Sequence, residues 1–289
     1  MIELLAPAKV NLCLRVFGKT DSGLHNLDSI VVFCQFGDKI RLRLAEKDSV
    51  DISGPFAPML AATKSADNLV STARDAFRNN GGSCGPVAIH LEKYIPVGAG
   101  LGGGSADAAA VLRGLNKLAT MPLPHENLFA IAADLGSDVP VCLAATPHRI
   151  TGTGEVIHQL DDIYAGALLL VNPLVYLSTA AVFQQLTPPY NEALPEVTNN
   201  DAVSLSEYGN DLEAVATRLV PEITDILQRF RRMPSCHAAQ MSGSGASCFG
   251  IFDDLADATA ACTEFQRAGY WTKPTRLSPA DTPAVGISP

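Results

Sequence analysis

The sequence predicts a two-domain α+β protein, and three observations support this fold class. The chain has 289 residues, 47% apolar and 18% charged, which is enough for two medium hydrophobic cores. Segments with strand and helix periodicity are mixed without a strict βαβ repeat. A cluster of glycines joins a strand pattern to a helix pattern in the first half. We expect domains at residues 1–157 and 158–289, with an α/β protein of two lobes as the alternative.

The first half is expected to contain four strands and three helices. Apolar runs and alternation predict strands at 1–17, 29–36, 39–44 and 87–96. The dipeptide Gly37-Asp38 separates the second strand from the third and predicts a hairpin. Helical periodicity followed by glycine or proline predicts helices at 68–80, 105–119 and 125–136.

The second half is expected to place two strands and three helices around a long loop. The strands are expected at 167–173 and 247–252, and the helices at 178–186, 211–230 and 255–269. The middle helix should be kinked or split near Pro221, because proline lacks a backbone donor and clashes with the preceding turn. Residues 186–200 are rich in proline and polar residues and predict the loop.

The composition disfavours several classes of protein. A formal net charge of −9 argues against a nucleic-acid binder. The longest apolar run, residues 165–171, is too short to cross a membrane, and the first sixteen residues lack a signal-peptide core. The seven cysteines form no C-x-x-C pair, and the histidines show no metal-ligand spacing. We therefore expect buried free thiols and a cytoplasmic monomer or weak homodimer that acts on a small molecule.

A glycine-rich loop is the strongest functional signal. The segment PVGAGLGGGSADAAA, residues 96–110, carries five glycines within the seven positions 98 to 104. Glycines let backbone N–H groups converge at positive φ, and the N-terminus of the following helix adds donors and partial positive charge. Phosphate is the natural ligand of such a loop. A tight turn without a ligand would explain one or two glycines but not five.

Three other phosphate motifs fit this loop less well. Gly98, Gly100 and Gly103 satisfy G-x-G-x-x-G, but no second strand ending in an acidic residue follows, as a dinucleotide fold requires. Neither H-R-D nor D-F-G of the protein kinases occurs. The tripeptide GKT is present at 18–20, yet Cys13 stands where a Walker A motif needs its first glycine.

Three segments resemble, in the right order, the motifs of the GHMP kinase superfamily, which includes galactokinase, homoserine kinase and mevalonate kinase. They are residues 7–16 (PAKVNLCLRV), the glycine-rich loop, and residues 241–252 (MSGSGASCFGIF). The resemblance implies a ribosomal-protein-like N-terminal domain, a ferredoxin-like C-terminal domain, and ATP as phosphoryl donor together with Mg²⁺. It places these residues on the ATP: Pro96, Gly98, Gly100, Leu101, Gly102, Gly103, Gly104 and Ser105.

Further segments resemble the branch of the superfamily that phosphorylates 4-diphosphocytidyl-2-C-methyl-D-erythritol in the non-mevalonate isoprenoid pathway. They are residues 23–40, 135–143 and 209–213. Leu24 stands where this branch has a tyrosine that stacks on the cytosine. The nearest alternative is a GHMP kinase with another acceptor, such as homoserine or phosphomevalonate. A non-catalytic member of the fold and a dinucleotide-dependent oxidoreductase are more distant alternatives.

The resemblance assigns the chemistry to two residues. Asp138 would accept the proton of the reacting hydroxyl group or orient that group. Lys9 would pair with this aspartate and stabilise the charge of the transition state. Taken alone, Asp138 could be a solvated turn residue, and Lys9 could extend its ammonium group from a strand edge to solvent. Asn11 lies two residues after Lys9, on the same strand face, and would hydrogen-bond the substrate.

The resemblance also assigns the acceptor site. His25 would hydrogen-bond the cytosine, and Phe183 is a candidate stacking partner, although core packing explains it equally well. A glycine-serine loop would offer backbone N–H groups to the acceptor or to the transferred phosphoryl group; its residues are Ser242, Gly243, Ser244 and Gly245. Ser105 is a candidate Mg²⁺ ligand, but the sequence identifies no carboxylate dedicated to the ion.

Overall fold

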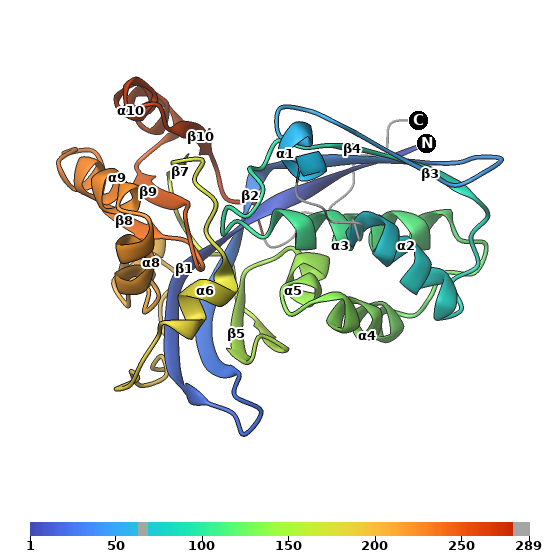
Figure 1. The fold of residues 1–289 in the computed structure, drawn as a ribbon, viewed down its shortest axis with the longest axis horizontal. Coiled ribbons are helices and arrows are strands. Elements are labelled where there is room, and N and C mark those ends of the chain that lie inside the picture. Colours follow the sequence, from blue (N-terminus) through green and yellow to red (C-terminus); the bar gives the residue numbers. More distant parts are fainter. Residues whose placement is uncertain (63–68, 280–289) are drawn as a thin grey trace.

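Two long antiparallel strands connect the halves of the molecule. The computed structural model describes residues 1–62 and 69–279. In it β1 (Ile2–Lys19) pairs with β2 (His25–Leu44) along most of its length, and Figure 1 shows the two strands running from one lobe into the other. Side chains of β1 contribute to the cores of both lobes, Leu4 to the first and Leu14 to the second.

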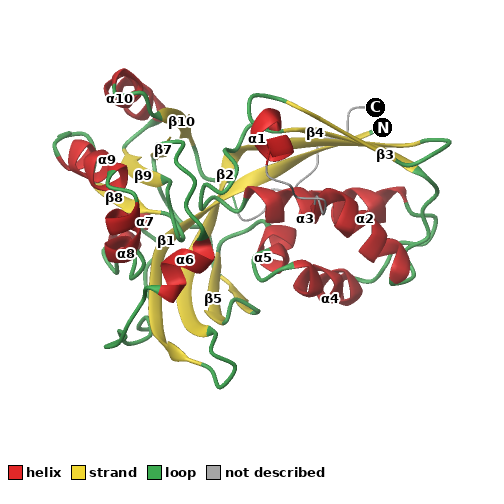
Figure 2. Cartoon of the chain, in the orientation of Figure 1, coloured by secondary structure: helices red, strands yellow, loops and turns green. Residues whose placement is uncertain are grey.

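The first lobe is a six-stranded sheet with helices packed on one face (Figure 2). The strand order is β3-β4-β2-β5-β6, with β1 along the other edge of β2. The additional strands are β3 (Ser49–Ser53), β4 (Val87–Glu92), β5 (His148–Gly152) and β6 (Val156–Gln159). The helices are α1 (Ala57–Ala62), α2 (Leu69–Asn79), α3 (Gly103–Leu118), α4 (His125–Leu135) and α5 (Val139–Ala144). Their apolar faces and the sheet enclose one core, which includes Phe33, Phe77 and Val111.

The second lobe is a four-stranded antiparallel sheet of order β10-β7-β9-β8. Its strands are β7 (Ala167–Asn172), β8 (Ala238–Met241), β9 (Cys248–Phe252) and β10 (Trp271–Thr275). Its helices are α6 (Thr179–Gln184), α7 (Ala202–Ser206), α8 (Glu213–Leu219), α9 (Glu222–Arg231) and α10 (Leu255–Arg267). Phe230 of α9, Phe252 of β9 and Phe265 of α10 meet in its core.

The hairpin predicted at Gly37-Asp38 is wrong, because β2 continues through both residues. Gly37 lies opposite Pro7, beside a register shift in β1, and a Cβ at Gly37 would lie 2.1 Å from the carbonyl oxygen of Ala6. The glycine therefore permits a close approach of two strands and does not form a turn. Asp38 is buried and accepts a hydrogen bond from Lys93, which explains a polar residue in mid-strand.

The longer predicted elements are present, and the predicted split near Pro221 is confirmed by the break between α8 and α9. The first residue of the helix predicted at 68–80 lies outside the described residues, as do the last ten residues of the second predicted domain. The sequence did not predict eight elements of four to six residues, too short to show a period: β3, α1, α5, β5, β6, α7, β8 and β10.

The domain boundary expected after residue 157 falls inside β6, so we propose that it lies between Gln159 and Ala167.

The cysteines are free thiols, as predicted: five are buried, and Cys84 and Cys236 are half-buried. Burial raises the pKa of Cys13 and of Cys34 to about 12.

Among the described residues, no helix combines the length and the apolar character needed to cross a membrane. The cytoplasmic location and the oligomeric state remain predictions.

Asp48 ties the turn after β2 to α2 and β4, and this contact should make stability depend on pH. Its carboxylate accepts hydrogen bonds from Arg78 Nη1 and Nη2 and from the backbone N–H of Val87. The bonds from Arg78, aided by that from Val87, lower the pKa of Asp48 from 3.8 to about 2. Because the folded value lies below the unfolded one, the carboxylate stabilises the fold above about pH 4, and this contribution is lost as the pH falls toward 2.

Asp48→Asn should therefore be less stable than wild type at neutral pH, and the difference should shrink between about pH 4 and pH 2. Urea unfolding at a series of pH values measures it, with the exposed Asp21→Asn as control. A difference that does not change with pH would show that Asp48 does not carry this dependence.

Candidate active site

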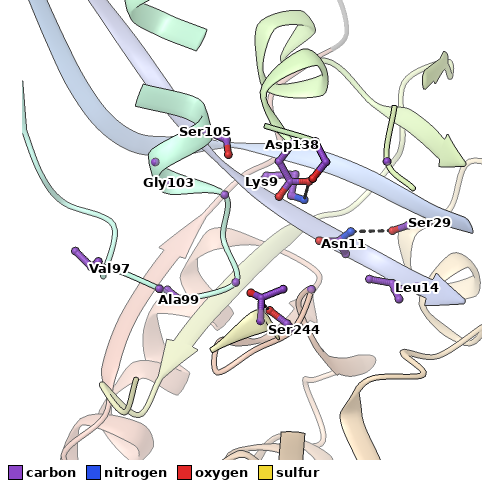
Figure 3. Close-up of a pocket in the computed structure, with 18 of the residues that line it drawn as sticks. Lys9, Asn11, Leu14, Ser29, Val97, Ala99, Gly103, Ser105, Asp138 and Ser244 are labelled. Carbon is purple, nitrogen blue, oxygen red and sulfur yellow. Dashed lines mark hydrogen bonds and ion pairs between the residues drawn. The ribbon is translucent and has the colours of Figure 1, made fainter. Parts of the chain in front are cut away.

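A cavity of about 400 Å³ brings residues from both lobes together. It is lined by Lys9 and Asn11 of β1, by most of residues 96–105, and by Ser137 and Asp138 before α5. From the second lobe come Thr179, Phe183, Gly243 and Ser244. Figure 3 shows Lys9, Asn11, Ser105, Asp138 and Ser244 around the same space. Segments distant in sequence thus form one site.

Lys9 and Asp138 form an ion pair at the centre of this site. Lys9 Nζ donates to Asp138 Oδ1 at 2.7 Å, across 129 positions of sequence. The Lys9 side chain is 6% exposed and that of Asp138 is 42% exposed, so the lysine does not extend to solvent while the carboxylate remains accessible. Asp138 immediately precedes α5, and Pro140 in the first turn of that helix has no N–H, so this turn has one fewer donor to satisfy.

The glycine-rich loop has the backbone conformation that glycine favours. Gly98, Gly100 and Gly102 have φ values of 67°, 72° and 64°. Gly102 is the N-cap of α3, and no side chain caps it, so N–H groups of the first turn are free to bind an anion. The loop is anchored to β1, because the N–H of Lys9 donates to the carbonyl oxygen of Leu101 at 2.9 Å. The Leu101 side chain is buried in the core.

The glycine-serine loop packs directly against the glycine-rich loop. A Cβ at Gly100 would lie 2.5 Å from the carbonyl oxygen of Gly245. The Ser242 hydroxyl donates to the carbonyl oxygen of Gly100 at 3.1 Å and accepts the N–H of Asn11 at 3.2 Å. Ser242 and Gly245 thus join the two loops without lining the cavity, whereas Gly243 and Ser244 line it. Asn210, in a segment singled out in the sequence, donates to the carbonyl oxygen of Gly243 at 2.8 Å.

His25 lies beside the cavity in an aromatic cluster. Its ring centroid is 5.2 Å from that of Phe183, which lines the cavity, and 5.9 Å from that of Tyr190. Burial, with a contribution from the charge of Lys19, lowers the pKa of His25, which favours the neutral form of the ring. Its Nε2 is buried without a hydrogen-bond partner among the described residues. The sequence did not predict Tyr190, which lies in the proline-rich loop.

A buried charge cluster lies under the glycine-rich loop. Lys93 donates to Asp107 at 2.7 Å and also to Asp38, and all three side chains are at most 3% exposed. Burial raises the pKa of Asp107 to about 8, although the Lys93 ammonium acts in the opposite direction. A Cβ at Gly103 would lie 3.0 Å from Lys93 Nζ, so the cation is next to the start of α3. The cluster connects β2, β4 and α3, the elements that position the loop.

Sequence reasoning missed much of the cavity wall. Most of the missed side chains are apolar or small and carry no motif, and they include Leu14, Leu27, Ser29, Leu60, Leu69 and Thr179. Lys93 and Asp107 offered a stronger signal, since they flank the glycine-rich loop on both sides. Asp38, the third residue of the buried charge cluster, was missed because the sequence analysis placed it in a hairpin turn.

Gly102→Val should weaken nucleotide binding. Gly102 has a positive φ, and an added Cβ would lie 3.1 Å from Cβ and 3.4 Å from Cε of Lys9. The larger side chain would strain the N-cap and block the approach of a phosphate to α3. Calorimetric titration with a non-hydrolysable ATP analogue measures the loss. Gly269→Val is the matched control, because Gly269 also has a positive φ but open space around it. Unchanged affinity in folded Gly102→Val would exclude this role for the loop.

The site fits a magnesium-nucleotide complex better than a permanent metal. No group of three or more His, Cys, Asp or Glu side chains with metal-binding geometry occurs in residues 1–62 and 69–279. Magnesium, however, commonly binds through one or two protein oxygens together with substrate phosphates and water. The Ser105 hydroxyl, in the first turn of α3, lines the cavity and provides such an oxygen.

Comparison with known proteins agrees with this geometry. Residues 68–146 match the GHMP kinases N terminal domain, and residues 191–270 match the GHMP kinases C terminal domain. The 4-diphosphocytidyl-2-C-methyl-D-erythritol kinase of Brucella abortus is 43% identical, with 96% of each chain covered.

Solved structures support the same relationship. A crystal structure of 4-(cytidine 5'-diphospho)-2C-methyl-D-erythritol kinase has a TM-score of 0.80 and 31% identity, covering 95% of this chain and 99% of the other. Homoserine kinase from Cytophaga hutchinsonii, at 19% identity and a TM-score of 0.69 with 96% of each chain covered, shares the fold. The chain therefore belongs to the GHMP kinase superfamily and, within it, to the family of 4-diphosphocytidyl-2-C-methyl-D-erythritol kinases.

Proposed function

We infer that this chain transfers the γ-phosphoryl group of ATP to the 2-hydroxyl group of 4-diphosphocytidyl-2-C-methyl-D-erythritol. The observation that carries this inference is the Lys9–Asp138 ion pair inside a cavity bordered by the glycine-rich loop. The nearly full-length similarity to kinases named for this acceptor supports the choice of substrate.

The triphosphate lies, in this proposal, on the glycine-rich loop. The left-handed glycines allow backbone N–H groups to converge on the phosphates, and the uncapped start of α3 adds partial positive charge. The residues proposed to contact ATP run from Pro96 to Ser105. Leu101 contributes its backbone, since its side chain is in the core.

The reacting hydroxyl group lies between Asp138 and the γ-phosphorus atom. Phosphoryl transfer depends mainly on positioning and charge stabilisation, with one carboxylate to orient or deprotonate the nucleophile. Asp138 accepts the hydroxyl proton as the new O–P bond forms, and ADP leaves. Lys9, held at 2.7 Å from this carboxylate, stabilises the negative charge that develops on the oxygen.

The cytosine binds, in this proposal, beside the aromatic cluster. A neutral His25 ring can both donate and accept a hydrogen bond, as recognition of a base edge requires. Phe183, in contact with His25 and the cavity, offers a face for stacking. Leu24, in contrast, is 58% exposed and provides no aromatic face. Gly243 and Ser244 line the same side of the cavity and are proposed to meet the acceptor phosphates.

Ser105 would hold Mg²⁺ together with the phosphates of ATP. The bound ion would neutralise charge on the β- and γ-phosphates. The Ser105 hydroxyl is in the first turn of α3, so its position depends on the same loop anchors that hold Leu101 and Gly102.

A panel of acceptors tests the proposed function. The purified protein is incubated with ATP and Mg²⁺ and with the cytidyl methylerythritol compound, homoserine or phosphomevalonate, and ADP formation is followed. We expect kcat/KM for the cytidyl compound to exceed the other two by several orders of magnitude. Preference for homoserine or phosphomevalonate would assign a different acceptor. If none of the three acceptors increases ADP formation, the proposed kinase activity is contradicted.

A further inference from the structure

Ser29 and Asn11 form a hydrogen-bond relay that the assigned chemistry does not explain. Asn11 is on β1, two residues after Lys9, and Ser29 faces it from β2. Asn11 Nδ2 lies 2.8 Å from Ser29 Oγ, and Ser29 Oγ lies 2.6 Å from the carbonyl oxygen of Cys13. Both side chains are at most 4% exposed, and both residues line the cavity (Figure 3).

The relay determines which end of the Asn11 amide faces Ser29. The Cys13 carbonyl can only accept a hydrogen bond, so the single hydroxyl hydrogen of Ser29 points to it. Toward Asn11 the serine oxygen can then only accept. The amide group beside it must therefore be the NH₂ group, and the carbonyl oxygen must point the other way.

The carbonyl oxygen so oriented has no partner. Asn11 Oδ1 is buried and accepts no hydrogen bond from any described residue. It lies on the side of Gly243, 3.3 Å from the position that a Cβ there would occupy, and Gly243 also lines the cavity. An unsatisfied buried acceptor is costly, so a ligand that brings a donor to this point gains affinity.

We propose that Ser29 is a positioning residue that holds the Asn11 carbonyl oxygen ready to accept a hydrogen bond from a hydroxyl group of the acceptor substrate. The proposal rests on the proposed function for the identity of that substrate. ATP phosphates offer no hydrogen donors at neutral pH, and an unpaired carbonyl oxygen repels them. The matching group is a hydroxyl, as on the polyol part of the acceptor near the Lys9–Asp138 pair. Ser29 acts through Asn11, so a neighbouring hydroxyl is fixed while Asp138 takes the reacting one.

Removing the hydroxyl of Ser29 frees the amide to rotate. Ser29→Ala should lower kcat/KM for the acceptor about two- to tenfold, the factor that one lost neutral hydrogen bond gives. The KM for ATP should stay within twofold. Ser29→Thr retains a hydroxyl group and should restore activity. Ser206→Ala is the matched control, because Ser206 is also buried and also donates to a backbone carbonyl, but does not line the cavity.

A double-mutant cycle separates positioning from a general structural role. If Ser29 acts through Asn11, then Ser29→Ala should have no further effect on kcat/KM when Asn11 is already alanine. An equal loss in both backgrounds would show that Ser29 acts independently and would overturn the proposal. So would a Ser29→Thr variant as impaired as Ser29→Ala.

Hydrogen exchange of the Asn11 side-chain amide, followed by NMR, tests the orientation without activity. The NH₂ hydrogens should be protected in wild type and in Ser29→Thr, and exposed to exchange in Ser29→Ala. Rapid exchange in wild type would contradict the relay even if no variant folds. If wild type phosphorylates none of the acceptors yet shows this protection, the proposed function fails while the orientation imposed by Ser29 stands.

Discussion

Asp138→Asn should lower kcat by about 10²–10⁴ while the KM for ATP changes little. The substitution keeps the size of the side chain and its place before α5, but an amide cannot accept the hydroxyl proton. Stopped-flow or coupled assays of ADP release measure the loss. Asp225→Asn is a matched control, because Asp225 is 43% exposed and also bonds a cationic side chain at 2.7 Å, but does not line the cavity.

Lys9→Ala should cause a loss of similar size, because the ammonium group and the carboxylate form one unit at 2.7 Å. Groups that act together are non-additive, so the double variant should be little worse than the worse single variant. Near-normal turnover in either single variant would refute its assignment. Losses that multiply fully would show that Lys9 acts on the nucleotide phosphates independently of Asp138.

Lys93→Met should destabilise the fold by about 3–5 kcal/mol, the usual result of leaving buried charge without its partner. Asp38 and Asp107 would both lose the cation that now bonds them, and the buried negative charge that they share would be left without its counter-ion. Asp38 also accepts the N–H of Ile95 at 2.8 Å, so the entrance to the glycine-rich loop would loosen as well. Urea unfolding in the absence of nucleotide measures the change.

Two further variants make the Lys93 result interpretable. Lys47→Met removes an exposed lysine and should be close to neutral. Adding Asp38→Asn to Lys93→Met removes buried negative charge, while the amide oxygen can still accept the N–H of Ile95, and should recover part of the lost stability. If the double variant is no more stable than Lys93→Met, an unpaired buried charge does not explain the destabilisation.

The long elements of the fold were predictable because their signals are local. The helix after the glycine-rich loop is long enough to show helical periodicity, and the strand at Ala167–Asn172 is a continuous apolar run. The hairpin error at Gly37 had a physical cause: glycine also permits two strands to approach closely, and only the partner strand distinguishes the two uses. Similarly, β10 contains Pro274, which is tolerated because the strand is at the edge of its sheet.

The parts of the candidate site that lie in contiguous sequence motifs could be predicted. The contacts between residues distant in sequence could not. The glycine-rich loop is contiguous, so its anion-binding geometry could be inferred from residues 98–105 alone. The partner of Lys9 could not be found from spacing, since 129 positions separate it from Asp138, and resemblance to a family supplied that link. Ser29 carries no motif at all. Its importance arises from the register of β1 and β2, which places it beside Asn11 and Cys13.

The most direct test of the central claim is to identify the product by ³¹P NMR after incubation of wild-type protein with ATP, Mg²⁺ and 4-diphosphocytidyl-2-C-methyl-D-erythritol. The account predicts one new phosphomonoester resonance on the 2-hydroxyl position, equal in amount to the ADP formed, and its absence with Asp138→Asn over the same time. A phosphoryl group on another hydroxyl, or ADP without a phosphorylated acceptor, would contradict the account.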